Sequence, residues 1–80
     1  MNKKELWNWI KDLFDKADEQ ELGTSWSWFG FKKNDELVEL NYKEKGLTFD
    51  NLLLLLQELS NDGLLQLINT HNMGFIIVKK

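Results

Sequence analysis

The chain has 80 residues, a net charge of −3 and 42% hydrophobic residues, which together fit one small domain with a well-filled core. It has no cysteine and a single histidine, which excludes disulfides, thiolate metal sites and histidine-based metal sites. No apolar run reaches the roughly 18 residues that a membrane span needs, and the basic N-terminus leads into an amphipathic segment, unlike a signal peptide. We therefore expect a cytoplasmic protein with no membrane partner.

The ten positively charged residues are all lysines. Arginine is the residue that makes bidentate contacts to guanine edges and phosphates, and lysine replaces it poorly there. The absence of arginine therefore argues against nucleic acid as a direct ligand. The residue usage, with many leucines and asparagines and no proline, is typical of AT-rich genomes such as those of low-GC bacteria, their phages and mobile elements.

A capping box formed by Asn2 and Glu5 predicts the start of a first helix. Apolar residues then recur at helical spacing, namely Leu6, Trp9, Ile10, Leu13, Phe14 and Ala17. Trp7 lies at the edge of this stripe. We expect the helix to run to about Glu21 and to stop at Gly23, because glycine readily adopts the left-handed conformation.

Two strands are predicted next. Residues 24–32 are rich in aromatic and hydroxyl side chains, which is typical of a strand. A turn at residues 33–35 leads into residues 36–43, where apolar and polar side chains alternate. The apolar residues of this second strand, which we expect inside, are Val38, Leu40 and Tyr42.

The second half of the chain begins with Thr48, a good N-cap for a leucine-rich helix that residues 60–63 interrupt. Residues 64–69 fit a short third helix ending at Asn72, because their apolar positions do not alternate. A strand over residues 64–69 is the alternative. Residues 74–78 are apolar on both faces and predict a final strand paired inside the sheet.

The predicted fold is therefore a single α+β domain over residues 1–80, with the order α-β-β-α-(α)-β. Its sheet has three strands, mostly antiparallel, and its helices pack on one face. If residues 64–69 form a strand instead, the order becomes α-β-β twice, which is the pattern of a duplicated unit.

Five acidic residues crowd the predicted end of the first helix: Asp12, Asp15, Asp18, Glu19 and Glu21. Carboxylates at this end oppose the helix dipole, and such a local conflict is typical of functional surfaces. The cluster can dock on a basic protein surface, such as a nucleic-acid-binding cleft. The commoner alternative is a solvated face that keeps the protein soluble. The spacing lacks the turn glycine of calcium loops, so we expect no metal.

The tryptophans of the first strand are the second candidate site. Strand alternation puts Trp26 and Trp28 on one face and Phe29 and Phe31 on the other. We expect the tryptophan pair in the core, because so small a domain needs its largest side chains there. The alternative is an exposed binding platform, to which Trp7 on the first helix would add.

Catalytic machinery is not recognisable in the sequence. His71 has no nucleophile in a suitable motif, and no phosphate loop or dinucleotide-binding glycine pattern is present. We therefore expect neither catalytic residues nor a cofactor.

These observations favour a small acidic module that binds another protein and inhibits or modulates it. The phage-like residue usage indicates an anti-defence protein of the anti-CRISPR type, or else an immunity protein or antitoxin. The first alternative is a structural protein that assembles as a homodimer through a sheet edge, and the weaker one is a small-molecule binder or enzyme.

Overall fold

The computed structural model describes residues 1–70 and 74–80, and all statements about structure refer to these residues. The predictions for His71 and Asn72 lie outside the described residues. The elements in chain order are α1 (Lys3–Lys16), β1 (Glu21–Ser25), β2 (Trp28–Lys33), β3 (Glu36–Leu40), the 3-10 helix η1 (Tyr42–Lys45), α2 (Phe49–Asn61), β4 (Leu65–Thr70) and β5 (Gly74–Lys79).

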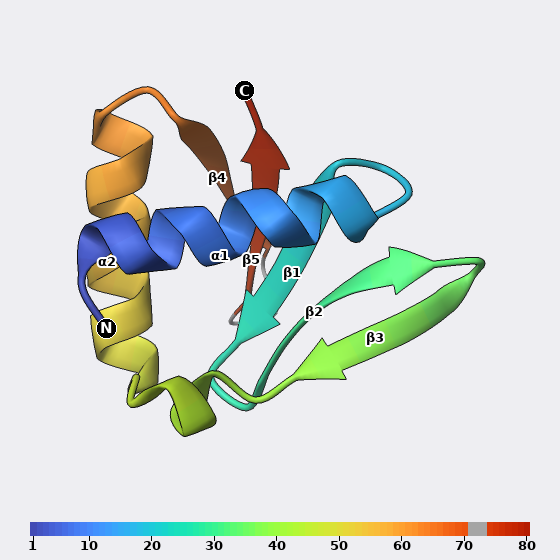
Figure 1. Cartoon of the computed structure of the whole chain (residues 1–80), viewed down its shortest axis with the longest axis horizontal. Helices are drawn as coiled ribbons and strands as arrows, with labels where there is room; N and C mark the ends of the chain where they lie inside the picture. Colours follow the sequence, from blue (N-terminus) through green and yellow to red (C-terminus); the bar gives the residue numbers. More distant parts are fainter. Residues whose placement is uncertain (71–73) are drawn as a thin grey trace.

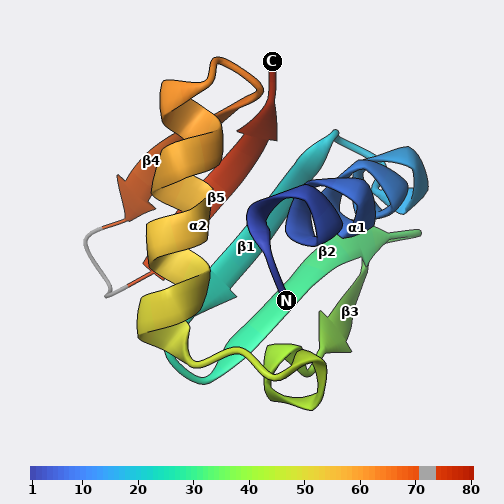
Figure 2. The ribbon, with the colours of Figure 1, turned by 60° about the vertical axis from the view of Figure 1, so that its left-hand side comes forward.

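The described strands form one antiparallel five-stranded sheet in the order β3-β2-β1-β5-β4. Helices α1 and α2 both lie on one side of this sheet, as Figures 1 and 2 show. The α+β class and the helices on one face are therefore confirmed, but the predicted three-stranded sheet is too small. None of the described helices is long and apolar enough to cross a membrane.

Helix α1 begins as predicted. The Asn2 side chain accepts a hydrogen bond from the Glu5 amide at 2.8 Å, and the Glu5 carboxylate accepts one from the Asn2 amide. The helix ends earlier than predicted, at Lys16. Gln20 makes the reversal with a φ of 56°, and its side-chain amide donates to the carbonyl of Phe14 at 2.8 Å. The predicted stop at Gly23 is wrong because Gly23 gains strand pairing on both sides within β1.

The predicted strand over residues 24–32 is in fact two strands, β1 and β2. A two-residue turn at Trp26 and Ser27 separates them, and Ser25 pairs with Trp28 across it. The Ser25 hydroxyl accepts a hydrogen bond from the Ser27 amide at 3.3 Å, which stabilises the turn. The turn has no glycine, asparagine or proline, so composition did not reveal it.

The turn predicted at residues 33–35 is confirmed. Asn34 and Asp35 both have positive φ angles, of 54° and 64°, as tight hairpins between twisted strands require. Strand β3 then ends at Leu40, and Tyr42 lies in η1 instead of continuing the strand. Tyr42 is buried as expected, whereas Val38 is only half-buried on the edge strand.

The predicted third helix is wrong, and the alternative strand over the same residues is correct. β4 pairs with β5 along its full length, from Leu65 opposite Lys79 to Thr70 opposite Gly74. The apolar spacing of this short run favours a helix, but the neighbouring β5 supplies backbone partners along its whole length, and this pairing decides. β5 itself lies inside the sheet, as predicted, between β1 and β4.

The core fills the space between the helices and one face of the sheet. Its fully buried apolar side chains come from both helices, from η1 and from β1, β2, β4 and β5: Leu6, Ile10, Phe14, Leu22, Phe29, Tyr42, Leu52, Leu56, Leu59, Leu65 and Ile77. Trp9 packs edge-on against Phe29, with ring centroids 5.2 Å apart. The aromatic residue that faces the helices from β2 is thus phenylalanine.

Candidate functional site

The sheet face that the helices leave uncovered carries Trp28. Phe29 pairs with Leu40 on β3 and is fully buried under the helices. Alternation along β2 therefore turns Trp28 and Gly30 to the opposite side. Trp28 is half-buried there, and Trp26, in the turn, is 61% exposed. The prediction that the tryptophan pair fills the core is wrong, because the Trp26–Ser27 turn takes Trp26 out of the strand and the register of β2 faces the phenylalanines inward.

Two glycines shape the uncovered face beneath Trp28. Gly23 on β1 pairs with Gly30 on β2, so this part of the sheet has no side chains. A Cβ added at Gly23 would lie 2.7 Å from the Cη2 atom of Trp28, which shows that the indole lies across the Gly23 backbone. A Cβ at Gly30 would meet the carbonyl oxygen of Val38. The glycines thus let the outer end of the Trp28 ring lie against the sheet and let β3 approach β2 closely.

A hollow of about 230 Å³ opens beside the indole. Trp28, Leu37 and Ile76 form its apolar walls, and Glu19, Glu21 and Lys32 form its charged rim. We call these six residues, with Gly23 and Gly30, the open-face site. The hollow is smaller than the roughly 300–1,000 Å³ of typical small-molecule pockets, and its size suits a single protruding side chain.

Trp28 also borders a second hollow, of about 370 Å³, on the side of β3 and η1. Its other walls include Glu39, Asn41 and Tyr42. The indole is therefore a ridge between two depressions, and a partner can contact it from both sides. Tryptophan in such a setting is among the residues that most often dominate the free energy of protein association.

The charged rim of the open-face site has more negative than positive charge, because it contains two carboxylates and one ammonium group. Burial raises the pKa of the Glu21 carboxyl above its usual range, and the neighbouring Glu19 carboxylate raises the same pKa further. The Lys32 ammonium group has the opposite, weaker effect on it. A cation placed beside Glu19 and Glu21 would relieve this repulsion, so the rim favours a basic ligand.

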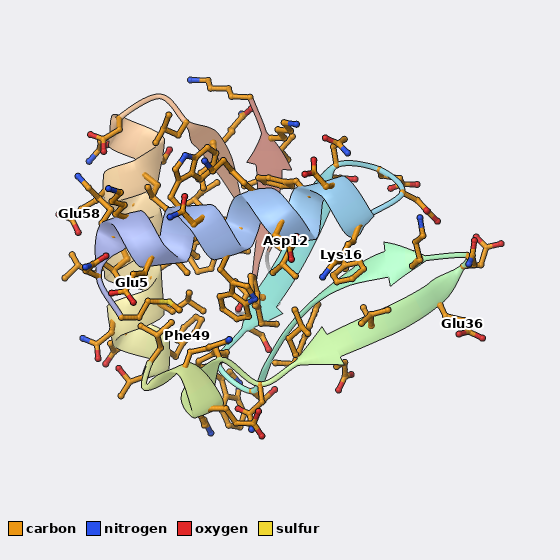
Figure 3. All side chains as sticks on the ribbon, viewed as in Figure 1. Glu5, Asp12, Lys16, Glu36, Phe49 and Glu58 are labelled. Atoms are coloured by element: carbon orange, nitrogen blue, oxygen red, sulfur yellow. The ribbon has the colours of Figure 1, made fainter. Side chains whose placement is uncertain are left out.

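The structure divides the predicted acidic cluster into three groups. Asp12 forms an ion pair with Lys16 at 2.9 Å along α1, as Figure 3 shows, and Asp15 is exposed on the same helix. Asp18 instead holds the β2–β3 turn, and only Glu19 and Glu21 lie at the open-face site.

The carboxylate of Asp18 accepts a hydrogen bond from the Asn34 amide at 2.8 Å and pairs with Lys33 at 3.3 Å. The Asn34 hydrogen bond, followed by the Lys33 charge, holds the pKa of Asp18 below its usual range. Asp18 therefore has a structural role in the turn.

The predicted tryptophan platform is also divided. Trp7 lies on α1, on the helix side of the sheet, where the Lys11 ammonium stands 5.7 Å from its ring centroid. Trp26 lies in the β1–β2 turn, and its carbonyl accepts a hydrogen bond from the Tyr42 hydroxyl. Of the tryptophans predicted to bind a partner, Trp28 is the one at the open-face site.

Sequence reasoning missed several residues of the open-face site. Gly23 carries the local signature of a helix stop, and Ile76 belongs to a strand that is apolar on both faces, so its pattern does not show which face stays open. Leu37 precedes the alternating residues of β3 and is 50% exposed. The available signal was the spacing Trp28-x-Gly30, since a glycine two positions along a strand leaves space on the same face.

Within residues 1–70 and 74–80, no group of three or more histidine, cysteine or acidic side chains is arranged to hold a metal ion. Comparison of the chain with protein families, curated proteins and solved structures finds no match. The chemistry of the open-face site therefore carries the functional argument.

Proposed function

We propose that this protein is an acidic protein-binding module, and that it binds its partner through the open-face site. The observation that carries the proposal is the position of Trp28, whose indole lies over Gly23 on a sheet face that α1 and α2 do not cover. A buried position would serve stability better, because burying an aromatic ring is strongly favourable. An indole between two hollows is instead suited to contact another protein.

The partner's surface is basic and presents one apolar side chain. The apolar walls of the 230 Å³ hollow accept that side chain, and Glu19 and Glu21 on the rim pair with a neighbouring lysine or arginine. The net charge of −3 acts in the same direction, because it steers a basic surface toward the protein. Nucleic-acid-processing enzymes have basic surfaces of this kind.

The function that follows is inhibition or modulation of such an enzyme. A small module that covers a basic cleft prevents nucleic acid from entering it. We propose an anti-defence role in a phage or mobile element, of the anti-CRISPR type, and support it with the small size, the acidity and the residue usage of AT-rich genomes. An immunity protein or antitoxin would use the same surface chemistry against a different target.

A pair of exposed leucines on opposite sides of the molecule tests the binding face. Leu37 lies at the open-face site and is 50% exposed, and Leu54 lies on α2 and is 57% exposed. A photo-crosslinking amino acid at position 37 should capture the partner in the source cell, and the same group at position 54 should not. Capture from position 54 alone would contradict the proposed face.

The purified partner then allows a quantitative test. Trp28→Ala and Leu37→Lys should weaken binding at least about tenfold, as loss of a central contact does, while Leu54→Lys should bind as the wild type does. Glu19→Gln with Glu21→Gln should slow association at low salt more than at high salt. If the partner binds but keeps its full enzymatic activity, the inhibitory role is wrong and the binding face stands.

A further inference from the structure

The two edges of the sheet differ in charge. β3 forms one edge and carries Glu36 and Glu39, both exposed; Figure 3 shows Glu36 at the β2–β3 hairpin, near the start of β3. β4 forms the other edge, and its residues Leu65–Thr70 include no charged side chain and no proline. Proteins usually protect exposed edges with charges, prolines or bulges, because unpaired amides and carbonyls there recruit other strands. The edge at β3 has such protection and the edge at β4 does not.

β4 is also regular enough to pair again. Its register with β5 is unbroken over six residue pairs, so it has no bulge that would turn its outer edge away. Within the described residues, that outer edge has no strand partner and receives no further backbone hydrogen bond. A regularly paired, uncharged strand of this length is a template for one more antiparallel strand.

We propose that β4 pairs antiparallel with β4 of a second copy of this chain, so that the two sheets become one continuous sheet. A two-fold axis centred on Ile68 places Ile68 opposite its own symmetry mate and Gln66 opposite Thr70. In this register no charged groups meet, and the Ile68 side chain, which is 42% exposed in the single chain, becomes covered.

The two-fold arrangement also limits the assembly to two copies. Both copies use the same edge, so no unprotected β4 edge is left for a third copy. Pairing of β4 with β3 of another copy would instead continue as a filament. It would bring Glu36 and Glu39 against an uncharged strand, where their loss of water is not compensated.

Helix α2 provides a second contact at the same boundary. α2 packs on β4, and Asp62, which caps the C-terminal end of α2, pairs with Lys3 of α1 at 3.0 Å. Leu53 precedes Asp62 by nine residues, which is two and a half helical turns, so it lies on the side of α2 that faces away from α1. That side adjoins the β4 edge in Figure 2, and Leu53 is only half-buried there. In the proposed dimer, this side of α2 therefore lies at the boundary with the second copy.

Ile68 lies opposite Ile76 on the same uncovered sheet face as the open-face site, but neither Ile68 nor Leu53 lines the hollow beside Trp28. The dimer is tested by self-association alone, so its failure would be distinguishable from failure of the proposed function. The dimer would place two open-face sites on the same side of one continuous sheet. A partner with two basic patches, or a dimeric partner, would then be held by both sites at once.

Sedimentation equilibrium tests the dimer on the full chain at concentrations up to about 1 mM, a range that reveals even weak association. The wild type should reach twice the 9.5 kDa mass of one chain and no more. Ile68→Lys should raise the dissociation constant about tenfold or more, since two lysines would face each other across the axis. Leu37→Lys, an equal change on the β3 edge, should leave the dimer intact.

A wild-type mass of one chain over the whole range would overturn the proposal, as would a mass that keeps growing with concentration. Retention of the dimer by a folded Ile68→Lys variant would show that β4 is not the interface. Hydrogen exchange of the wild type gives a result that requires no variant: the β4 amides should be better protected at high than at low protein concentration. Equal protection at both concentrations would count against the β4 contact.

Discussion

The hydroxyl group of Tyr42 donates a hydrogen bond to the backbone carbonyl of Trp26, sixteen residues earlier in the chain. This bond connects η1 to the turn between β1 and β2. Tyr42 is 1% exposed, so its ring packs in the core while its hydroxyl reaches the turn. The turn that removes Trp26 from the strand, and so decides which face Trp28 occupies, is therefore tied to the core through Tyr42.

Removing this hydroxyl should loosen the turn without unfolding the protein. Tyr42→Phe should lower the free energy of unfolding by about 0.5–1.5 kcal/mol, the usual net value of one hydrogen bond. Urea denaturation at neutral pH measures this change. A variant as stable as the wild type would show that water replaces the hydroxyl at the Trp26 carbonyl.

The same tyrosine predicts a loss of stability in alkali. Burial raises the pKa of Tyr42 above its ordinary value. The neutral phenol is therefore favoured in the folded state, and its contribution is complete below the unfolded pKa of about 10 and is lost as the pH rises through the folded-state pKa. The difference in stability between wild type and Tyr42→Phe should shrink over that range. A constant difference between the two proteins would contradict the assignment.

The glycine pair beneath Trp28 predicts two unequal effects. Gly30→Ala should cost about 1–3 kcal/mol, as overpacking does, because its Cβ would meet the backbone carbonyl of Val38, which cannot rotate away. Gly23→Ala should cost less, because the Cβ would meet the outer end of the Trp28 ring, and that ring can tilt.

The tilted indole of the Gly23→Ala variant should be more exposed to water, which a red shift of tryptophan emission reports. Trp28→Phe in the same background is the matched control and should show no such shift. If Gly23→Ala is the more destabilising of the two glycine substitutions, the indole is held more firmly than we infer.

The Asp18 carboxylate predicts a specific weakness in acid. Because its folded-state pKa is lowered, its contribution is present above the unfolded pKa of about 4 and is lost as the pH falls through the folded-state value. Asp18→Ala should therefore be less stable than the wild type at pH 7, and the two should converge at low pH. Denaturation midpoints across this range measure the effect, and Asp15→Ala serves as the control on α1. Parallel curves for wild type and Asp18→Ala would be inconsistent with the bond to Asn34.

The inward-facing side of β2 predicts which aromatic residue supports the fold. Phe29 is fully buried against Trp9, whereas Trp26 is 61% exposed. Phe29→Ala should cost about 3–5 kcal/mol, and Trp26→Ala should change stability little, because its bond to Tyr42 uses the backbone carbonyl. Thermal unfolding compares the two variants directly. A Trp26→Ala variant as unstable as Phe29→Ala would contradict the exposed position of Trp26 and support the prediction that the tryptophans lie in the core.

The sequence alone was sufficient for features that depend on near neighbours. The capping box of Asn2 and Glu5, the cap at Thr48 and the turn at Asn34 and Asp35 all involve residues three positions apart or fewer, so their signal is complete within a short window. The α+β class also followed, since the two long helices and the alternating strands have clear periods. The sequence also showed which aromatic and acidic residues are candidates for partner binding. It did not show which of them lie together in the folded protein.

Only the tertiary structure decided the features that depend on pairing between distant segments. β4 is a strand because β5 is beside it, and Gly23 is a strand residue because β2 and β5 flank it. The face of Trp28 depends on a turn that Tyr42 helps to hold and on the register of Phe29 with Leu40. A shift of one residue in that register would exchange every side chain between the core and the open face. The local pattern of β2 satisfies both arrangements, and the contacts with β3, η1 and α1 select the one that leaves Trp28 beside the hollow.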